Sequence, residues 1–513
     1  MERIHPVRST SRLLLFLGLL CPLVLAGCTS APDDDAASSQ AAATSAAPSG
    51  PVAAVCDKMP PGPATAPAGA QAVAVTDDFA AKVRDAAAGT TFWLAPGSHH
   101  LGDDRFDQVQ PKDGDVFIGG PGAVLDGRKI NQYAFTGHAK NVKITNLTVQ
   151  NFVAPRDEGV VNHDSGDGWV IQHATVQDND GAGLMAGNKQ QVLDNCLRRN
   201  GQYGMNAFSA DDDITGLVVR GNEITGNNTG DWEKKIDGCG CTGGIKFWAV
   251  NGADVVGNWV HDNRGTGLWA DTNDNDFLIE GNLIESNDSA AIIYETSYNA
   301  VIRNNTIRRN NLVDGRDYAD RGDSFPTATI YISESGGEPR VKARTSKLEI
   351  YGNVFENNWN GITLWENADR FCNSPANTSS GVCTKLQPDT AKCAAPAIAQ
   401  KPLYDDCRWK TQRVDIHNNR FTLQPSAIGC EETCGRMGLL SNFGTYPDWS
   451  PYKGDVVQNA ITFKQGNSWH DNAYVGPWTF IATDMSHVLG IGEWEGAPYN
   501  QDARTTYQRN GGG

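Results

Sequence analysis

A pattern of apolar and Asn residues recurs along the middle of the chain. An apolar residue is followed three positions later by Asn, a second apolar residue comes two positions after that, and another Asn follows five positions after the first. The five clearest copies are Asn222/Ile224/Asn227, Asn258/Val260/Asn263, Asn282/Ile284/Asn287, Asn305/Ile307/Asn310 and Asn353/Phe355/Asn358. Their first Asn residues lie 36, 24, 23 and 48 positions apart, so the base period is 23–24 residues.

A period of this length predicts a solenoid in which each repeat forms one coil. Strands of successive coils should pair about 4.8 Å apart, with apolar residues inside and Asn side chains stacked at the bends. A leucine-rich repeat has a similar period, but its Leu spacing and its helix are absent. We therefore expect an all-β fold, a parallel β-helix of roughly ten to fourteen coils.

The segment before the clear repeats is expected to cap the open end of this solenoid. The acidic pair Asp77 and Asp78 precedes a predicted short helix at residues 79–88, and Thr91–Leu94 predicts a strand. We assign residues 73–127 to this cap and the first coils, and residues 128–513 to the β-helix.

Two long stretches interrupt the repeat, at residues 229–242 and 368–410. Loops of that length in a compact fold are usually functional, and both contain pairs of Cys residues. We expect the two insertions to lie on either side of a substrate cleft.

The cap helix, the period and the Asn pattern together resemble the pectate-lyase-like superfamily of right-handed parallel β-helices. The resemblance extends over residues 73–480 and implies that the coils are right-handed. That fold carries lyases, hydrolases, epimerases and phage tailspikes, so the resemblance does not identify a substrate.

The N-terminus has the pattern of a bacterial lipoprotein signal. Three Arg residues and an apolar stretch lead to Leu25-Ala26-Gly27-Cys28, which looks like a lipobox. We predict a signal peptide at residues 1–27 and a lipidated Cys28 that attaches the protein to the membrane. Residues 28–72 are rich in Ala, Ser and Pro and predict a disordered tether. The expected location is the bacterial cell surface or the periplasm, and the expected form is a monomer.

Charge and cysteine content restrict the partners and the compartment. The formal net charge is −17, which disfavours binding to nucleic acid and, unless metal ions bridge the charges, to polyanionic sugars. Of the twelve Cys residues, ten follow Cys28, and an even number in an exported protein indicates disulfides. Proximity along the chain makes three bridges plausible, although it does not establish the connectivity: Cys372–Cys383, Cys393–Cys407 and Cys430–Cys434.

Three successive coils, aligned on their Asn residues, bring two acids to one position. In the alignment Ile245, Leu268 and Ile292 point inward, whereas Asp271 and Glu295 share an outward position one coil apart. Two carboxylates with backbones about 4.8 Å apart repel each other, which raises the pKa of one and suits an acid beside an anion. Retaining glycosidases use a carboxyl pair about 5–5.5 Å apart, although side-chain rotamers leave the stereochemical outcome open.

The sequence around these acids, GLWAD followed by IIYETS, resembles the catalytic coils of family 120 glycoside hydrolases, which are retaining β-xylosidases. The resemblance implies that Asp271 is the nucleophile and Glu295 the acid/base. It is confined to two coils and the flanking sequences differ, so it does not imply specificity for xylose. Solvated acids on the coil surface are the simpler interpretation of the same pair.

Further residues are expected on this outward face. Lys246, one coil before Asp271, is a candidate for holding a substrate hydroxyl, for neutralising Asp271, or for abstracting a proton. Glu334 and Glu366 are expected to extend the face and to bind sugar hydroxyls or a metal. Three indole rings are candidates for stacking on sugars or for packing beneath loops: Trp248, Trp269 and Trp365.

The leading hypothesis is a glycoside hydrolase that cleaves a polysaccharide with Asp271 and Glu295 and requires no cofactor. The first alternative is a polysaccharide lyase or epimerase with Lys246 as the base and Ca²⁺ beside the acids. Solvated turn acids or Ca²⁺ ligands are the two interpretations of Asp211, Asp212 and Asp213, where no EF-hand pattern is present. The second alternative is a non-catalytic carbohydrate-binding surface protein.

Overall fold

The computed structural model describes residues 52, 54–209, 214–236, 240–377, 382–430, 433–445 and 447–509. The signal peptide, the lipidation site Cys28 and the three acids Asp211, Asp212 and Asp213 lie outside these residues. In the described part of the chain, no helix has the length and apolar character needed to cross a membrane.

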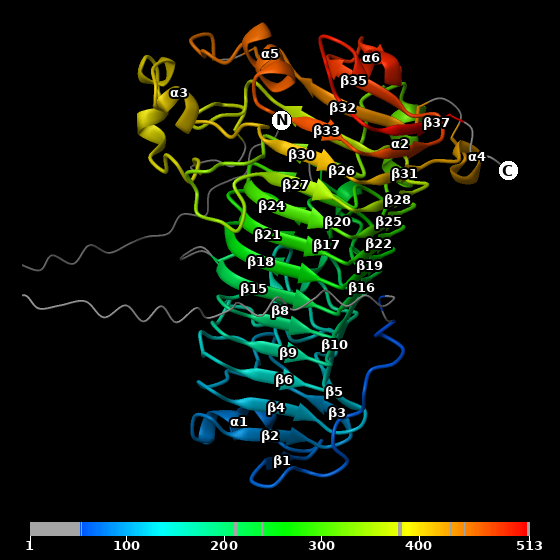
Figure 1. The fold of residues 1–513 in the computed structure, drawn as a ribbon. Coiled ribbons are helices and arrows are strands. Elements are labelled where there is room, and N and C mark those ends of the chain that lie inside the picture. Colours follow the sequence, from blue (N-terminus) through cyan, green and yellow to red (C-terminus); the bar gives the residue numbers. More distant parts are fainter. Residues whose placement is uncertain are drawn as a thin grey trace, which may run out of the picture. The chain divides into compact units, whose positions relative to one another are not determined.

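Three sheets wind around one core, and successive strands of the chain pass from sheet to sheet (Figure 1). Sheets 1 and 2 have 13 strands each and sheet 3 has 11, and all neighbouring strands are parallel except β35 and β36. The fold is the expected right-handed parallel β-helix, and its strand count agrees with the coil number estimated from the period.

Sheet 1 contains β1 (Gln71–Val73), β2 (Thr91–Leu94), β4 (Val116–Gly119), β6 (Lys143–Thr145), β9 (Val170–Gln172), β12 (Gln191–Leu193), β15 (Ile214–Arg220), β18 (Val250–Val256), β21 (Asn275–Glu280), β24 (Tyr298–Arg303), β27 (Leu348–Tyr351), β30 (Val414–His417) and β33 (Ser468–His470). Sheet 2 contains β3 (Gly97–His100), β5 (Ala123–Asp126), β7 (Thr148–Gln150), β10 (Thr175–Gln177), β13 (Cys196–Arg198), β16 (Glu223–Thr225), β19 (Trp259–His261), β22 (Leu283–Glu285), β25 (Thr306–Arg308), β28 (Val354–Glu356), β31 (Arg420–Thr422), β34 (Ala473–Val475) and β37 (Thr506–Gln508). Sheet 3 contains β8 (Gly159–Val161), β11 (Ala182–Met185), β14 (Tyr203–Ala207), β17 (Gly243–Phe247), β20 (Thr266–Ala270), β23 (Ile292–Glu295), β26 (Ile330–Ser333), β29 (Ile362–Glu366), β32 (Arg436–Ser441), β35 (Thr479–Thr483) and β36 (Val488–Leu489).

The repeated Asn residues form two amide ladders at the bends on either side of sheet 2. In the first ladder, Nδ2 of Asn222 donates to Oδ1 of Asn258 at 2.9 Å, and Asn258 donates to Asn282 at 3.0 Å. In the second, Asn227 donates to Asn263 at 2.9 Å in the same way. Each amide oxygen also accepts a main-chain N–H, so these buried polar groups are satisfied coil by coil. The predicted ladder is confirmed.

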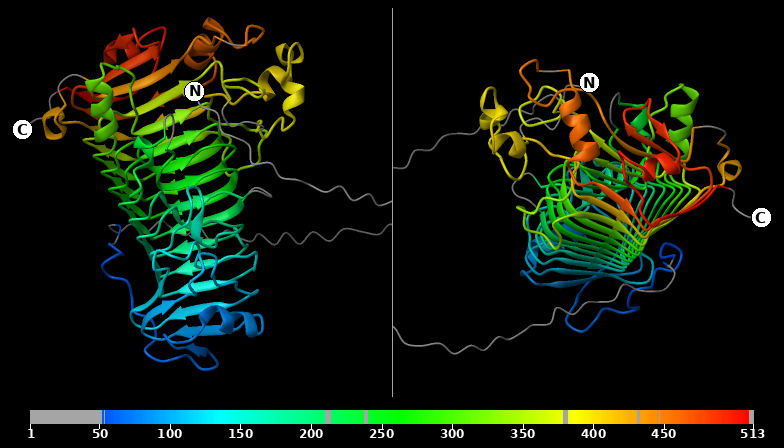
Figure 2. Two further views of the ribbon diagram at one scale, coloured as in Figure 1. Left: turned by 180° about the vertical axis from the view of Figure 1, so that it is seen from behind. Right: turned by 45° about the horizontal axis from the view of Figure 1, so that its top comes forward.

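Helices close the two ends of the solenoid. At the first coils, α1 (Phe79–Asp85) begins at Asp78, whose carboxylate accepts the N–H of Ala81 at 2.9 Å, and Phe79 packs edge-on against the rings of Phe92 and Phe117. At the other end, α5 (Asp455–Phe463) and α6 (Ile491–Glu495) lie against β35 (Figure 2). The remaining helices are α2 (Leu312–Asp320), α3 (Leu403–Asp406), α4 (Pro425–Ile428) and the 3-10 helices Trp232–Lys234, Thr390–Cys393 and Ala397–Ala399.

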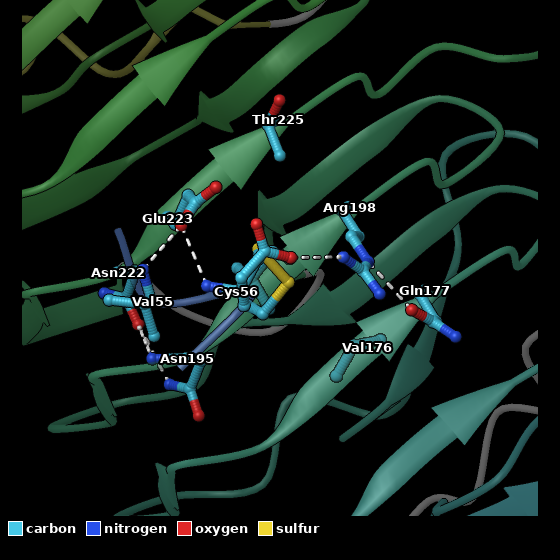
Figure 3. Close-up of a disulfide and its surroundings, with 12 residues drawn as sticks. Val55, Cys56, Val176, Gln177, Asn195, Arg198, Asn222, Glu223 and Thr225 are labelled. Atoms are coloured by element: carbon cyan, nitrogen blue, oxygen red, sulfur yellow. Dashed lines mark hydrogen bonds and ion pairs between the residues drawn. A yellow bond between two sulfur atoms is a disulfide. The ribbon is translucent and has the colours of Figure 1, made fainter. Parts of the chain in front are cut away.

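Residues 54–72 were expected in the disordered tether, but they are ordered against the outside of the solenoid. A disulfide joins Cys56 to Cys196 of β13, and Glu223 of the next coil accepts the N–H groups of Val55 and Cys56 at 2.6 and 2.8 Å (Figure 3). Farther along, Asn146 donates to the carbonyl of Pro60 at 3.0 Å. The prediction of disorder rested on the local composition, which gives no information about a disulfide between residues 140 positions apart.

All three bridges inferred from proximity are present: Cys372–Cys383, Cys393–Cys407 and Cys430–Cys434. Cys56–Cys196 is an additional bridge that proximity could not identify. Structural disulfides are typical of proteins that fold outside the cytoplasm, which supports an extracytoplasmic location.

The two insertions leave the solenoid at opposite ends of the sheet 3 strands. The described residues 229–236 and 240–242 lead into β17, whereas the described residues 368–377 and 382–410 follow β29 and carry α3 (Figure 1). The second insertion has a core of its own, in which Phe371 and Ile398 pack with both of its disulfides and with Tyr452. The two insertions therefore lie next to opposite ends of the strands of sheet 3.

Candidate active site

The register of sheet 3 places the two candidate acids on successive coils. Leu268 pairs with Ile292 and Trp269 with Ile293 across β20 and β23, so Asp271 and Glu295 occupy equivalent positions at the strand ends. The register derived from the Asn alignment is therefore confirmed. Neighbouring strands lie about 4.8 Å apart, which brings the two carboxylates to one outer face.

Asp271 forms an ion pair with Lys246 of the preceding coil. Oδ2 of Asp271 lies 3.0 Å from Nζ of Lys246, and the two side chains are 11% and 14% exposed. Burial disfavours the charged form of Lys246, but the carboxylate of Asp271 outweighs it and raises the pKa of the lysine. The ion pair therefore favours the ammonium form of Lys246 beside Asp271.

Trp269 lies between Lys246 and Glu295. The centre of the Trp269 ring lies 4.5 Å from Nζ of Lys246, and Nε1 of Trp269 donates a hydrogen bond to Oε2 of Glu295 at 3.2 Å. One face of the indole is therefore occupied by the ammonium, which limits the sugar stacking expected of this residue. In the observed conformation Trp269 instead orients Lys246 and Glu295.

A second cation comes from the insertion at residues 368–410. Nη1 of Arg370 forms an ion pair with Oε1 of Glu295 and lies 3.5 Å from Oε2 of Glu334. Burial works against the charge of Arg370, but the carboxylates of Glu295 and Glu334 raise its pKa. Sequence analysis did not identify Arg370, because its insertion lies outside the repeat and nothing in its local sequence links it to Glu295.

Glu334 reaches this cluster from an unexpected position. Glu295 pairs with Ser333, and Ser333 pairs with Trp365, so Ser333 rather than Glu334 continues the column of Asp271 and Glu295. The main chain turns at Glu334, which has a φ of 44°, and its side chain is 1% exposed. Burial raises the pKa of Glu334 to about 7, although Arg370 opposes the shift.

Glu366 does not join the cluster, contrary to the expectation that it binds substrate. It is 1% exposed, and its carboxylate pairs with Arg408 and accepts from the N–H of Thr411 at 3.0 Å and from Gln465 at 2.7 Å. All these partners come from the second insertion and the following coils. Glu366 therefore anchors the insertion to the solenoid.

Aromatic side chains lie on the same column, before and after the two acids. Trp248 follows Phe247, the partner of Ala270, and so lies one coil before Asp271. Its ring packs edge-on at 6.4 Å against Phe208, which is 41% exposed. On the other side, Trp365 contacts the ring of Phe325 at 5.4 Å. Both tryptophans thus flank the acids as the sequence predicted, and both also pack against another ring.

Among the described residues, only the sulfurs of Cys372, Cys383 and Cys393 are close enough together to share a metal ion, and all three belong to disulfides. The carboxylates of Asp271, Glu295 and Glu334 do not form such a group. Their cluster is instead organised by two side-chain cations.

Comparison with known proteins agrees with the fold. Residues 158–345 and 234–374 match the family model of the right handed beta helix region. No curated protein sequence matches the chain.

Solved structures that match the chain include several carbohydrate-active enzymes. The catalytic unit of a GH87 α-1,3-glucanase from Streptomyces thermodiastaticus is 13% identical, with a TM-score of 0.43, covering 82% of this chain and 69% of that one. The A-module of the mannuronan C-5 epimerase AlgE4 from Azotobacter vinelandii is 15% identical, with a TM-score of 0.38, covering 64% and 86%. The periplasmic alginate epimerase AlgG is 13% identical, with a TM-score of 0.37, covering 86% and 83%. At these identities and TM-scores the solved structures carry no argument about this chain. Its own three parallel sheets, together with the family match over residues 158–374, identify the chain as a right-handed parallel β-helix protein.

Proposed function

We propose that this protein is an extracytoplasmic carbohydrate-active enzyme that hydrolyses glycosidic bonds of a polysaccharide. The observation that carries the proposal is the pair Asp271 and Glu295, which occupies one register position on successive coils and in which each acid pairs with a buried cation. Two like charges at this spacing would destabilise the coils if no cation compensated them. The presence of both acids, each paired with a buried cation, favours a chemical role over a purely structural one.

Asp271 is the nucleophile in this proposal. Its carboxylate, which pairs with Lys246, attacks the anomeric carbon while the bond to the leaving oxygen breaks. Glu295 donates a proton to that oxygen and afterwards takes one from the water that hydrolyses the glycosyl ester. A backbone spacing of about 4.8 Å is close to the separation of about 5–5.5 Å in retaining enzymes.

The substrate is a neutral polysaccharide. The chain carries a net charge of −17, which repels polyanions, and aromatic rings on the acid column offer flat surfaces for sugars. Phe208 and Trp248 on one side of the acids, and Trp365 on the other, are the proposed sugar-stacking residues.

The test is a screen of the purified protein against neutral and acidic polysaccharides, with reducing ends and ultraviolet absorbance measured in parallel. We expect reducing ends without unsaturated products, and Asp271→Asn and Glu295→Gln should each abolish their release. Asp262→Asn removes an exposed carboxylate, 65% exposed, and serves as the matched control for charge loss. Unsaturated products would indicate a lyase, and retained glycan binding without any product would indicate a binding protein; either result rejects the hydrolase.

A further inference from the structure

Arg370 contacts two carboxylates that come from different coils. Its Nη1 pairs with Glu295 at the end of β23 and lies 3.5 Å from Glu334, which follows β26. Its Nε is buried and has no hydrogen-bond partner among the described residues. One nitrogen of the guanidinium therefore contacts both carboxylates, and Arg370 forms a bidentate ion pair with neither of them.

One positive charge cannot stabilise two buried carboxylates as anions at the same time. Glu334 is 1% exposed and Glu295 15% exposed, so ionising both would leave one of them without a counter-charge. The other groups that face them are the phenol of Tyr331 and, beyond Arg370, the acid Asp271, which is already neutralised by Lys246. None of these adds a cation to the pair, so one cation faces two carboxyl groups that are both largely buried, an arrangement that favours one proton between them.

The proposed hydrolysis gives this proton a purpose. An acid catalyst must carry a proton when the substrate binds, and Glu295 shares its cation, Arg370, with the buried Glu334. Burial raises the pKa of Glu334 to about 7, so this acid can hold a proton close to Glu295. Ser333 Oγ and the N–H of Asn367 donate to its two oxygens at 2.6 and 2.5 Å, an arrangement that suits the carboxylate left when the proton departs. These two donors hold the side chain beside Arg370 and prepare it to take the negative charge.

We propose, on the basis of the proposed function, that Glu334 is a positioning residue that stores the catalytic proton and exchanges it with Glu295 as Arg370 moves between them. In the resting protein Glu334 is protonated, and Arg370 pairs with the carboxylate of Glu295. When substrate binds, the proton leaves Glu334 and reaches Glu295, while Arg370 stays protonated and pairs with the new carboxylate of Glu334. After Glu295 has given its proton to the leaving oxygen and recovered one from water, the proton returns to Glu334.

The next coil provides a matched control. Glu366 follows Trp365 as Glu334 follows Ser333, and it too is paired with an arginine of the second insertion. Arg408, however, pairs with this one carboxylate, which also accepts from Thr411 and Gln465. Glu366→Gln therefore removes a buried acid of the same kind whose cation is not shared with Glu295 or Glu334, and any effect of loosening the insertion alone also appears in this variant.

The first experiment follows the infrared carbonyl band of protonated carboxyl groups as a function of pH, in the full protein without substrate. Asp314, whose pKa burial raises to about 6, also gives such a band, so the variants are compared with the wild type. We expect a component that disappears near pH 7 in the wild type and in Glu366→Gln but is absent in Glu334→Gln. In Glu295→Gln, Arg370 serves Glu334 alone, so the midpoint of this component should move to lower pH. A component near pH 7 that survives in Glu334→Gln, or an unchanged midpoint in Glu295→Gln, would overturn the proposal, and the second variant decides the matter if the first does not fold.

The second experiment measures the pH dependence of hydrolysis. Glu334→Gln should lower kcat about 100-fold with little change in KM, and its rate profile should lose the transition near pH 7. A purely structural role would reduce activity and melting temperature without changing the shape of the profile. If no polysaccharide is cleaved, the proposed function fails, whereas the infrared titration still decides whether Glu295 and Glu334 share a proton.

Discussion

Nδ2 of Asn273 donates a hydrogen bond of 2.6 Å to the main-chain carbonyl of Cys383. Asn273 lies two residues beyond Asp271, and Cys383 belongs to the insertion that supplies Arg370. Oδ1 of Asn273 accepts a hydrogen bond from Nε1 of Trp409 at 3.0 Å. One side chain thus fastens the insertion to the coil that carries the proposed nucleophile.

Replacing Asn273 should loosen the insertion while leaving the solenoid intact. Asn273→Gly tolerates the φ of 54° at this position but loses both hydrogen bonds, so we expect docking to weaken by about 1–3 kcal/mol. Hydrogen exchange should increase in residues 382–410 and hydrolysis should fall. Asn304→Gly, at an exposed position with a φ of 55°, is the control; equal exchange in both variants would contradict the anchoring role.

The Asn ladder should be a principal source of stability. Asn258 accepts from the N–H and Nδ2 of Asn222 and donates to Asn282 and to the carbonyl of Val219, all within the buried core. Asn258→Ala leaves several of these groups unsatisfied, so we expect a loss of about 3 kcal/mol or more. Thermal unfolding compared with Asn251→Ala, an exposed position on the same coil, measures the effect; similar melting temperatures would refute it.

The disulfide of the N-terminal segment should stabilise the protein more than the shortest bridge does. Cys56–Cys196 links residues 140 positions apart, whereas Cys430–Cys434 links residues 4 apart. Removing the long bridge as Cys56→Ser/Cys196→Ser should cost about 2–5 kcal/mol and expose residues 54–72 to proteases. The double Ser variant of Cys430 and Cys434 should cost less, and the reverse ranking would show that loop length does not decide stability here.

Stability should depend on pH through Glu334. Its pKa is raised from 4.5 in the unfolded chain to about 7 in the folded protein, mainly by burial, so the folded state binds more protons between these values. Stability from this group is complete below pH 4.5 and is lost as the pH rises to about 7, a change of about 3 kcal/mol. Calorimetry across this window should show a decline that is smaller in Glu334→Gln and unchanged in Glu366→Gln; the part that Glu334→Gln keeps includes Asp314, whose pKa burial raises to about 6.

The periodic part of the molecule could be predicted because each coil contacts only its neighbours. Burial, strand register and amide stacking then repeat in the sequence every 23–24 residues, which identified the fold, the Asn ladder and the alignment of Asp271 with Glu295. Short-range bridges such as Cys372–Cys383 could be inferred as well, because the two Cys residues lie close together along the chain. The lipid anchor at Cys28, the resemblance to family 120 and the catalytic roles of the two acids remain predictions.

The sequence by itself determined what recurs: a coil of constant length, its inward and outward positions and the adjacency of two acids. Only the tertiary structure decided what breaks the recurrence, namely that Arg370 reaches Glu295, that Glu334 leaves the column yet returns beside that arginine, and that Cys56 binds Cys196. Repeats record contacts between adjacent coils, whereas these contacts join residues whose separation follows no period. They depend on how an insertion or a terminal segment folds back in space, and local sequence carries no record of that path.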